Sequence, residues 1–275
     1  MKVIFFLMIT IMAFSCVQGK TKKSFSINKI ENKHLQVILD SSKVDGVILI
    51  YDYQKNKFYS NNFLKAKEAA LPASTFKIPN SIIGLETGVI KEKETIFKWD
   101  AKKRALSIWE KDLNLKEAFQ KSCVPCYQEV ARNIGAQKMN NYLKKLKFGK
   151  MDVNDKNIDT FWLIGKSKIS PFQQIDFLSR LYNKQLGVSE STNKAIRDIM
   201  IIKKGKNYTL SAKTGLSIRT KKIVAWFVGF IEKKGNIFFF ATKISPKSSD
   251  MSMREFSPIR KRITISALKK LKIIE

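Results

Sequence analysis

Histidine is nearly absent from this chain of 275 residues, in which His34 is the only one. It follows Glu31-Asn32-Lys33, a polar stretch that predicts a solvated surface position. Histidine is the side chain that most often serves as a catalytic base. A nucleophile in this chain therefore needs another base, and lysine, which is abundant, is the first candidate.

Acidic residues are also scarce, since 23 Asp and Glu stand against 52 Lys and Arg and give a net charge of +29. Such an excess is compatible with nucleic acid or an anionic membrane surface as a partner. The basic residues, however, are spread along the whole chain, without a dense block or a recognisable nucleic-acid module. We therefore expect no nucleic-acid partner. An apolar content of 44% predicts a packed globule.

Long apolar runs are missing after Gly19, so no membrane span is expected. The stretch 1–19 indicates a secretory signal peptide, because Lys2 precedes a short apolar run that is followed by small residues. Cleavage after Gly19 would give a soluble exported protein in the periplasm. Alternatively, Ala13-Phe14-Ser15-Cys16 loosely resembles a lipoprotein processing site, which would place a lipid anchor on Cys16.

Cysteine is limited to three residues, and beyond Cys16 only Cys123 and Cys126 remain. Their Cys-x-x-Cys spacing is that of thioredoxin-like redox motifs. No βαβ pattern leads into the motif, which argues against a redox function. A buried thiol pair and a short-range disulfide both fit, and the sequence does not choose between them.

The hydrophobic pattern predicts an α/β (α+β) protein of two lobes, with the 20–275 domain following the signal peptide. A sheet lobe is expected from about 25–75 and 206–275, and a helical lobe from about 76–205 is inserted between them. Helices are predicted over 28–39, from Ser74 to near Gly88, and over 106–121, 125–135, 137–147, 171–181, 192–202 and around 259–274. Strands are predicted over 46–53, 58–61, 207–215, 222–232 and 236–244.

A candidate nucleophile lies at the junction of the two lobes, in Leu71-Pro72-Ala73-Ser74-Thr75-Phe76-Lys77. Residues three apart share one face of a helix, so the Ser74 hydroxyl and the Lys77 amine can meet. Serine needs a neighbouring base, and lysine is that base in Ser-x-x-Lys acyl-transfer enzymes. The spacing alone proves little, because it recurs at Ser26/Lys29, Ser191/Lys194 and Ser266/Lys269. A preceding proline and flanking apolar residues distinguish Ser74.

Two motifs further along the chain complete a possible site. Ser122-Cys123-Val124 is expected to begin a helix, and Lys213-Thr214-Gly215 to end a strand. Lysine offers a positive charge to an acidic substrate, threonine a hydroxyl, and glycine a close approach to the strand edge. The combination suits acyl transfer on an anionic, amide-like substrate.

Ser-x-x-Lys, Ser-x-Val and Lys-Thr-Gly, in this order, closely resemble the class D (oxacillinase-type) serine β-lactamases, as do the flanking segments. The resemblance covers about residue 45 to the end. It implies the fold shared with penicillin-binding transpeptidases and hydrolysis of the β-lactam ring. No metal and no cofactor are implied, apart from CO2 or bicarbonate as the source of a carboxylated lysine.

Site roles follow from the resemblance position by position. Ser74 resembles the acylated nucleophile, Lys77 the lysine that is carboxylated, and Ser122 the hydroxyl that carries a proton to the lactam nitrogen. The apolar wall around the lysine corresponds to Phe76, Val124, Trp162 and Leu163. Substrate contacts correspond to Lys213, Thr214, Gly215 and Arg260, and the oxyanion hole to the backbone N–H groups of Ser74 and Leu216. Trp109 is expected to border the cleft.

One triplet departs from the family pattern, since Phe148-Gly149-Lys150 replaces the usual aromatic-Gly-Asn. We expect it to shape a loop. A β-lactam sensor domain and a penicillin-binding transpeptidase are the alternative functions. The preferred β-lactams, including carbapenems, and the choice between monomer and homodimer stay open.

Overall fold

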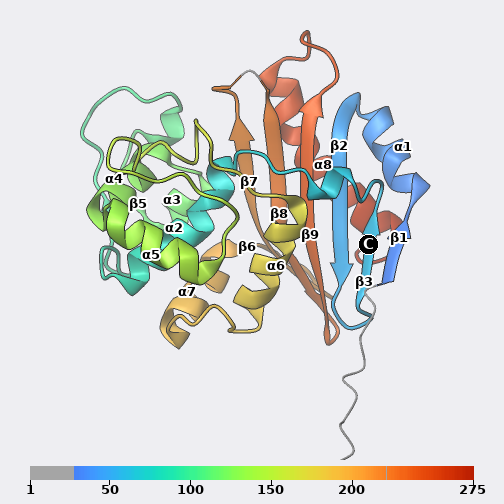
Figure 1. The fold of residues 1–275 in the computed structure, drawn as a ribbon, viewed down its shortest axis with the longest axis horizontal. Helices are drawn as coiled ribbons and strands as arrows, with labels where there is room; N and C mark the ends of the chain where they lie inside the picture. The colour runs from blue at the N-terminus through green and yellow to red at the C-terminus, as the bar shows by residue number, and fades with distance from the viewer. Residues whose placement is uncertain (1–27, 221) are drawn as a thin grey trace, which may run out of the picture.

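A seven-stranded sheet forms the centre of the computed structural model, which describes residues 28–220 and 222–275 (Figure 1). The predicted signal peptide and Cys16 lie outside these residues. The strand order is β1-β3-β2-β9-β8-β7-β6, and every pair is antiparallel except β1 with β3. The strands are β1 (Asn28–Glu31), β2 (Val44–Asp52), β3 (Lys57–Ser60), β6 (Ile201–Lys204), β7 (Thr209–Ser217), β8 (Val224–Lys233) and β9 (Asn236–Pro246).

Helices cover both faces of this sheet. One face is covered by α1 (Lys33–Ser41) and α8 (Met253–Lys270) (Figure 1). On the other face α6 (Pro171–Tyr182) and α7 (Glu190–Met200) contact the strands, as part of a larger group of helices from the middle of the chain. The others in this group are α2 (Lys77–Glu86), α3 (Leu115–Gln120), α4 (Val124–Ile134) and α5 (Ala136–Leu146). Short 3₁₀ helices are η1 (Lys65–Lys67), η2 (Ala73–Phe76) and η3 (Ser107–Trp109).

The two faces of the sheet bury separate cores because side chains alternate along a strand. In β2, Val47 and Leu49 join the core shared with the helical lobe. Ile48 and Ile50 join the core under α1 and α8. Central strands covered on both sides read as continuous apolar runs, which is why GVILIYDY was recognisable as a strand.

Two predicted helices differ from the structure. The stretch predicted as a helix over 28–39 begins as β1, because Asn28–Glu31 pairs with β3 and Asn32 then caps α1 by accepting from the His34 N–H. Within 106–121 only α3 is α-helical. Leu113–Asn114, as strand β5, pairs with β4 (Ile96–Phe97), and Asn114 starts α3 through a capping box with Glu117.

Candidate active site

The Ser74 turn is fixed by bonds from three parts of the chain. The Ala73 N–H donates to the Trp162 carbonyl at 3.0 Å. The Thr75 hydroxyl donates to the Pro72 carbonyl at 2.7 Å and accepts from the Gln174 amide at 2.9 Å. Ala73 itself adopts a left-handed conformation with φ 49°. Such strain persists only where neighbours hold it, and it is common at functional sites.

Lys77 is the first residue of α2, one turn after Ser74, and its Nζ lies 3.2 Å from the Ser74 Oγ. The side chain is fully buried, whereas Ser74 is partly exposed to solvent. Burial lowers the pKa of the Lys77 amine from 10.5 to about 7, because an ammonium loses its hydration in an apolar pocket. A neutral amine is therefore well populated beside the nucleophile near pH 7.

Aromatic rings build the pocket around Lys77. Phe76 stacks on Trp162 with ring centroids 5.3 Å apart and meets Phe161 edge-on at 4.7 Å. The Trp162 indole N–H is buried and finds no hydrogen-bond partner within the described residues. Since a buried donor without a partner is costly, an acceptor that the protein itself does not supply is needed there.

Ser122 lies in the short link between α3 and α4, where it adopts φ 54°. Its N–H donates to the Phe119 carbonyl at 3.1 Å, and the next N–H, of Cys123, donates to Ala118 at 2.9 Å. The Trp109 indole donates to the Lys121 carbonyl at 2.9 Å, directly before Ser122. The serine is thereby held against the end of α3.

Lys213 reaches across from β7 to this serine. Its Nζ donates to the Ser122 Oγ and, at 3.1 Å, to the Thr214 carbonyl. Burial lowers its pKa well below the usual value, and the positive charges of Lys77 and Arg260 lower it further. Positive charge on Lys77 or Arg260 therefore disfavours the charged form of Lys213, and an anion bound beside it would favour that form.

Arg260 comes from α8 and completes this cationic group. Its Nη1 donates to the Ser257 hydroxyl at 2.7 Å, while its buried Nε has no partner within the described residues. Burial lowers the pKa of the guanidinium to about 10. A guanidinium with a free donor matches a carboxylate, which it can bind through paired hydrogen bonds.

Gly215 has a packing function that the sequence did not reveal. A Cβ at this position would lie 3.0 Å from the Pro72 carbonyl and 3.2 Å from the Thr75 methyl. The missing side chain therefore lets β7 lie directly against η2. This contact sets Thr214 and Leu216 beside the Ser74 turn.

Comparison with known proteins assigns the family. A family model described as the penicillin binding protein transpeptidase domain matches residues 37–264. Beta-lactamase OXA-48 of Klebsiella pneumoniae is 39% identical over 244 residues, 89% of this chain and 90% of that protein. The class D beta-lactamase structure from Sebaldella termitidis is 39% identical with a TM-score of 0.85, covering 91% of this chain and 100% of that one.

The chain belongs to the class D β-lactamases. FUS-1 (OXA-85) from Fusobacterium nucleatum subsp. polymorphum, another class D enzyme, agrees with a TM-score of 0.83 at 33% identity, over 90% of this chain and 100% of that one. The protein is accordingly a serine hydrolase of the β-lactam ring, an activity that gives antibiotic resistance.

The structure brings the sequence-predicted residues of this class D β-lactamase together in groups. Ser74, Lys77, Phe76 and Trp162 form one group through the contacts above. Lys213 bonds to Ser122 in a second group, and Arg260 bonds to Ser257 of α8. Leu163 is buried and Val124 is partly buried, both against the same core. Over residues 28–220 and 222–275 no cluster of His, Cys, Asp or Glu is arranged to hold a metal ion, and no helix is both long and apolar enough to cross a membrane.

Tyr127 is a site residue that sequence reasoning missed. Its ring lies 5.1 Å from the Lys77 Nζ, and its hydroxyl is 2.6 Å from the Ser81 Oγ. The signal was present, because Tyr127 follows Val124 by three residues and so shares its face of α4. Phe119, whose ring lies 5.5 Å from the Lys213 Nζ, was missed as well.

The two cysteines left open by the sequence are joined as the disulfide Cys123–Cys126, across the first turn of α4. This crosslink flanks both Ser122 and Val124.

The Phe148-Gly149-Lys150 triplet shapes a loop through backbone contacts with residue Lys168. Gly149 has φ 61°, and a Cβ there would lie 2.6 Å from the Lys168 carbonyl. Lys150 forms a two-bond bridge with Lys168, both bonds 2.8 Å.

Proposed function

We propose that the enzyme hydrolyses penicillin-type β-lactams through an acyl-enzyme on Ser74, with a carboxylated Lys77 as the general base. The observation that carries this proposal is the fully buried amine 3.2 Å from the Ser74 hydroxyl. No histidine is available as an alternative, because the single His34 is exposed on α1.

The pocket fits a carboxylated lysine in three ways. Only a neutral amine reacts with CO2, and burial brings the pKa of Lys77 to about 7. The buried Trp162 N–H is free to donate to a carbamate oxygen. A negative charge on Lys77 would also relieve the repulsion that lowers the pKa of Lys213.

In acylation, Lys77, Ser74 and Ser122 would each have one role. When Lys77 carries the carboxyl group, its carbamate supplies a base in a dry pocket. The Ser74 oxygen gives its proton to the Lys77 side chain and bonds to the lactam carbonyl carbon. The N–H groups of Ser74 and Leu216 hold the oxyanion that forms. As the C–N bond breaks, Ser122 gives its proton to the lactam nitrogen and takes one from the Lys77 side chain, which is then again free to act as a base.

Deacylation would use the same base again. The Lys77 side chain takes a proton from water, which attacks the ester carbonyl and releases the opened acid, and the proton returns to Ser74. Lys213, Thr214 and Arg260 would bind the substrate carboxylate throughout. Arg260 and Lys213 bring positive charge and Thr214 a hydroxyl, so the site selects an anionic lactam.

Carbon-13 NMR with labelled bicarbonate tests the base. We expect one carbamate resonance that Lys77→Ala removes and Ser74→Ala retains. Activity should fall after acid treatment and return with bicarbonate. If the parent enzyme shows neither the resonance nor the bicarbonate response, Lys77 acts as a plain amine.

Intact-mass spectrometry tests the nucleophile. A penicillin should add its mass to the parent protein and not to Ser74→Ala. Steady turnover of a chromogenic cephalosporin is expected, and a single stoichiometric burst would instead indicate a sensor domain or a transpeptidase.

We also propose export to the periplasm, supported by the signal-like stretch 1–19 in the sequence. Processing before Cys16 would leave a lipid anchor, and cleavage after Gly19 a soluble enzyme. The mass of the mature protein distinguishes the two.

A further inference from the structure

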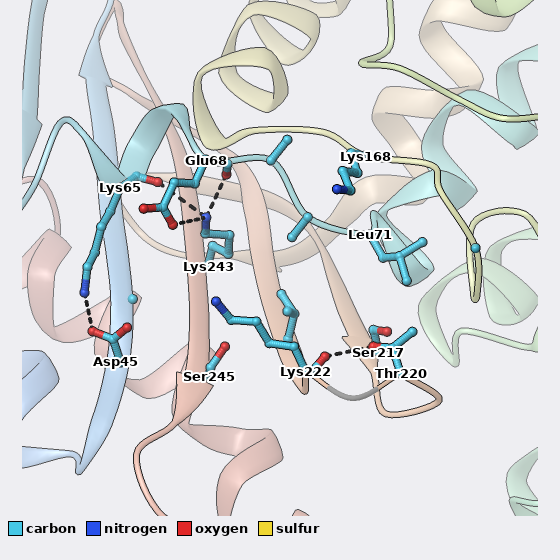
Figure 2. A pocket seen from close by; sticks show the side chains of 15 residues that line it. Asp45, Lys65, Glu68, Leu71, Lys168, Ser217, Thr220, Lys222, Lys243 and Ser245 are labelled. Atoms are coloured by element: carbon cyan, nitrogen blue, oxygen red, sulfur yellow. Dashed lines mark hydrogen bonds and ion pairs between the residues drawn. The ribbon is translucent and has the colours of Figure 1, made fainter.

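We propose that the enzyme has a second anion site, separate from the active site, that binds phosphate or a phosphomonoester. The site is a cavity of about 340 Å³ at one end of the sheet, a size typical of small-molecule sites. Its walls are the start of β2, the end of β9, the residues Thr220 and Lys222 between β7 and β8, the 65–71 segment and Lys168 (Figure 2). Ser74 does not line it.

Positive charge exceeds negative charge around this cavity. Four lysines and two carboxylates line it: Lys65, Lys168, Lys222, Lys243, Asp45 and Glu68. Lys65 pairs with Asp45. Lys243 is 3.7 Å from the Glu68 carboxylate and donates to the Glu68 carbonyl at 2.7 Å. Each carboxylate therefore already has a lysine.

Two ammonium groups at the cavity are left without a carboxylate. Within residues 28–220 and 222–275, neither Lys168 nor Lys222 takes part in an ion pair. Figure 2 shows Lys222 directed across the cavity towards Lys243 and Ser245, and Lys168 entering from the opposite side. Burial lowers the pKa of Lys243, and the charge of Lys222 lowers it further. Against the effect of burial, the bond to Lys65 holds the pKa of Asp45 low, and Lys222 adds to this. Repulsion between Lys222 and Lys243 favours an anion between them.

A buried hydroxyl gives independent support. Ser217 lines the cavity and is only 3% exposed, and its Oγ has no hydrogen-bond partner in the described part of the chain. A buried polar group without a partner is destabilising, so a ligand oxygen would satisfy it. Ser245 and Thr220 bring two more hydroxyls to the same wall.

The directions of these donors favour a tetrahedral anion. A carboxylate accepts hydrogen bonds mainly in its own plane. Here Lys168 and Lys222 enter the cavity from opposite sides (Figure 2), and the oxygens of a phosphate point in all directions. The cavity is larger than one phosphate ion, so an organic substituent on a phosphomonoester can be accommodated.

Inorganic phosphate and glycerol phosphate, at pH 7.5 and constant ionic strength, are the probes. We expect saturable binding by calorimetry and a rise in melting temperature that chloride does not reproduce. Lys222→Met should raise the dissociation constant about tenfold or more, because it removes a charge-assisted bond. Lys138→Met, an exposed lysine of α5, changes the net charge equally and should have no effect.

Ser217→Ala separates a ligand contact from a structural one. The variant should bind phosphate several-fold more weakly. Without phosphate its melting temperature should not fall, since the hydroxyl that is removed has no partner. A lower melting temperature together with unchanged binding would make Ser217 structural and overturn its part in the site.

Arg260→Ala locates the anion. The active site is also cationic, so binding that this variant abolishes would place phosphate there and refute the second site. Equal weakening in Lys222→Met and Lys138→Met would reduce the effect to net charge and refute it too. If phosphate and glycerol phosphate give no saturable binding at all, the second site is likewise refuted.

Discussion

At the scale of single residues, the buried Trp162 N–H, which has no partner in the described residues, tests the proposed carbamate. Trp162→Phe removes this donor and keeps most of the ring that stacks on Phe76. We expect slower deacylation, an accumulating acyl-enzyme, and about tenfold more bicarbonate for half-maximal activity, since a bond to a charged group is lost. Pre-steady-state kinetics and mass spectrometry over a bicarbonate series measure this.

Trp99→Phe is the matched control for this substitution. Trp99 is partly exposed and donates to the Lys102 carbonyl at 2.8 Å, in the loop before η3. Its bicarbonate response should equal that of the parent. If Trp162→Phe also behaves like the parent, the indole does not hold a carbamate.

Arg260 provides the second residue-scale prediction. A contact to the substrate carboxylate stabilises the bound substrate and the transition state about equally. Arg260→Ala should therefore raise KM for penicillins about tenfold and change kcat little. Arg262, exposed two residues further along α8, is the control, and Arg262→Ala should leave both constants unchanged. An unaltered KM in Arg260→Ala would remove this arginine from the substrate site.

Residue identity could be predicted well, and residue environment could not. Motif spacing was enough to propose Ser74, Lys77, Ser122 and Lys213 as one group. The free Trp162 N–H, the Tyr127 ring near Lys77, and the cationic convergence on Lys213 depend on three-dimensional distances that spacing does not encode.

At the scale of elements, the contact between β7 and η2 joins the strand that carries Lys213 and Thr214 to the turn that carries Ser74. Gly215→Ala would place a methyl group 3.0 Å from the Pro72 carbonyl and shift the strand by a few tenths of an ångström. Overpacking of this kind costs about 1–3 kcal/mol. We expect kcat/KM to fall by more than tenfold, because small misplacements of catalytic groups are expensive.

Gly84→Ala in α2 is the matched control. Its added methyl would meet the Ile90 side chain at 2.9 Å, a comparable crowding away from the substrate residues. Thermal denaturation should show a similar or smaller loss of stability, with kcat/KM unchanged. Equal catalytic losses in both variants would mean that Gly215 acts only through global stability.

Element boundaries were predicted where local signals were strong. The Ser170-Pro171 start of α6 is a complete capping box with proline in the first turn, as its sequence indicated. The helix predicted from 28 failed because pairing with β3 overrides local periodicity. The helix predicted from 106 failed because Asn114 and Glu117, a capping pair, were not recognised as a start.

At the scale of the whole molecule, the sheet places strands from the first and last parts of the chain side by side. Three basic residues that are far apart in the sequence come from the elements around it. Lys77 follows β3, Lys213 lies on β7, and Arg260 lies on α8. Residues far apart in the sequence thus place basic side chains close enough for the charges of Lys77 and Arg260 to lower the pKa of the buried Lys213, and an anionic substrate would offset this repulsion. A net charge of +29 adds a general attraction for anions.

The buried lysine also affects the stability of the whole enzyme. Its pKa is about 7 in the folded protein and 10.5 as the ordinary value. Between these values the unfolded chain binds a proton that the folded one lacks, so stability rises as pH increases from 7 to 10.5. The cost of burying the amine is therefore largest at pH 7 and below, and smallest above 10.5.

Lys77→Met should therefore give an inactive but more stable protein in bicarbonate-free buffer. Methionine keeps the length of the side chain without a charge, and the gain at pH 8 should be about 3 kcal/mol, since one pKa unit corresponds to about 1.4 kcal/mol. The gain should shrink between pH 8 and 10, whereas the exposed Lys138→Met should show none. Denaturant titrations at several pH values measure it. A gain independent of pH would show that Lys77 is not held neutral by burial, and bicarbonate should narrow the gap by stabilising only the parent.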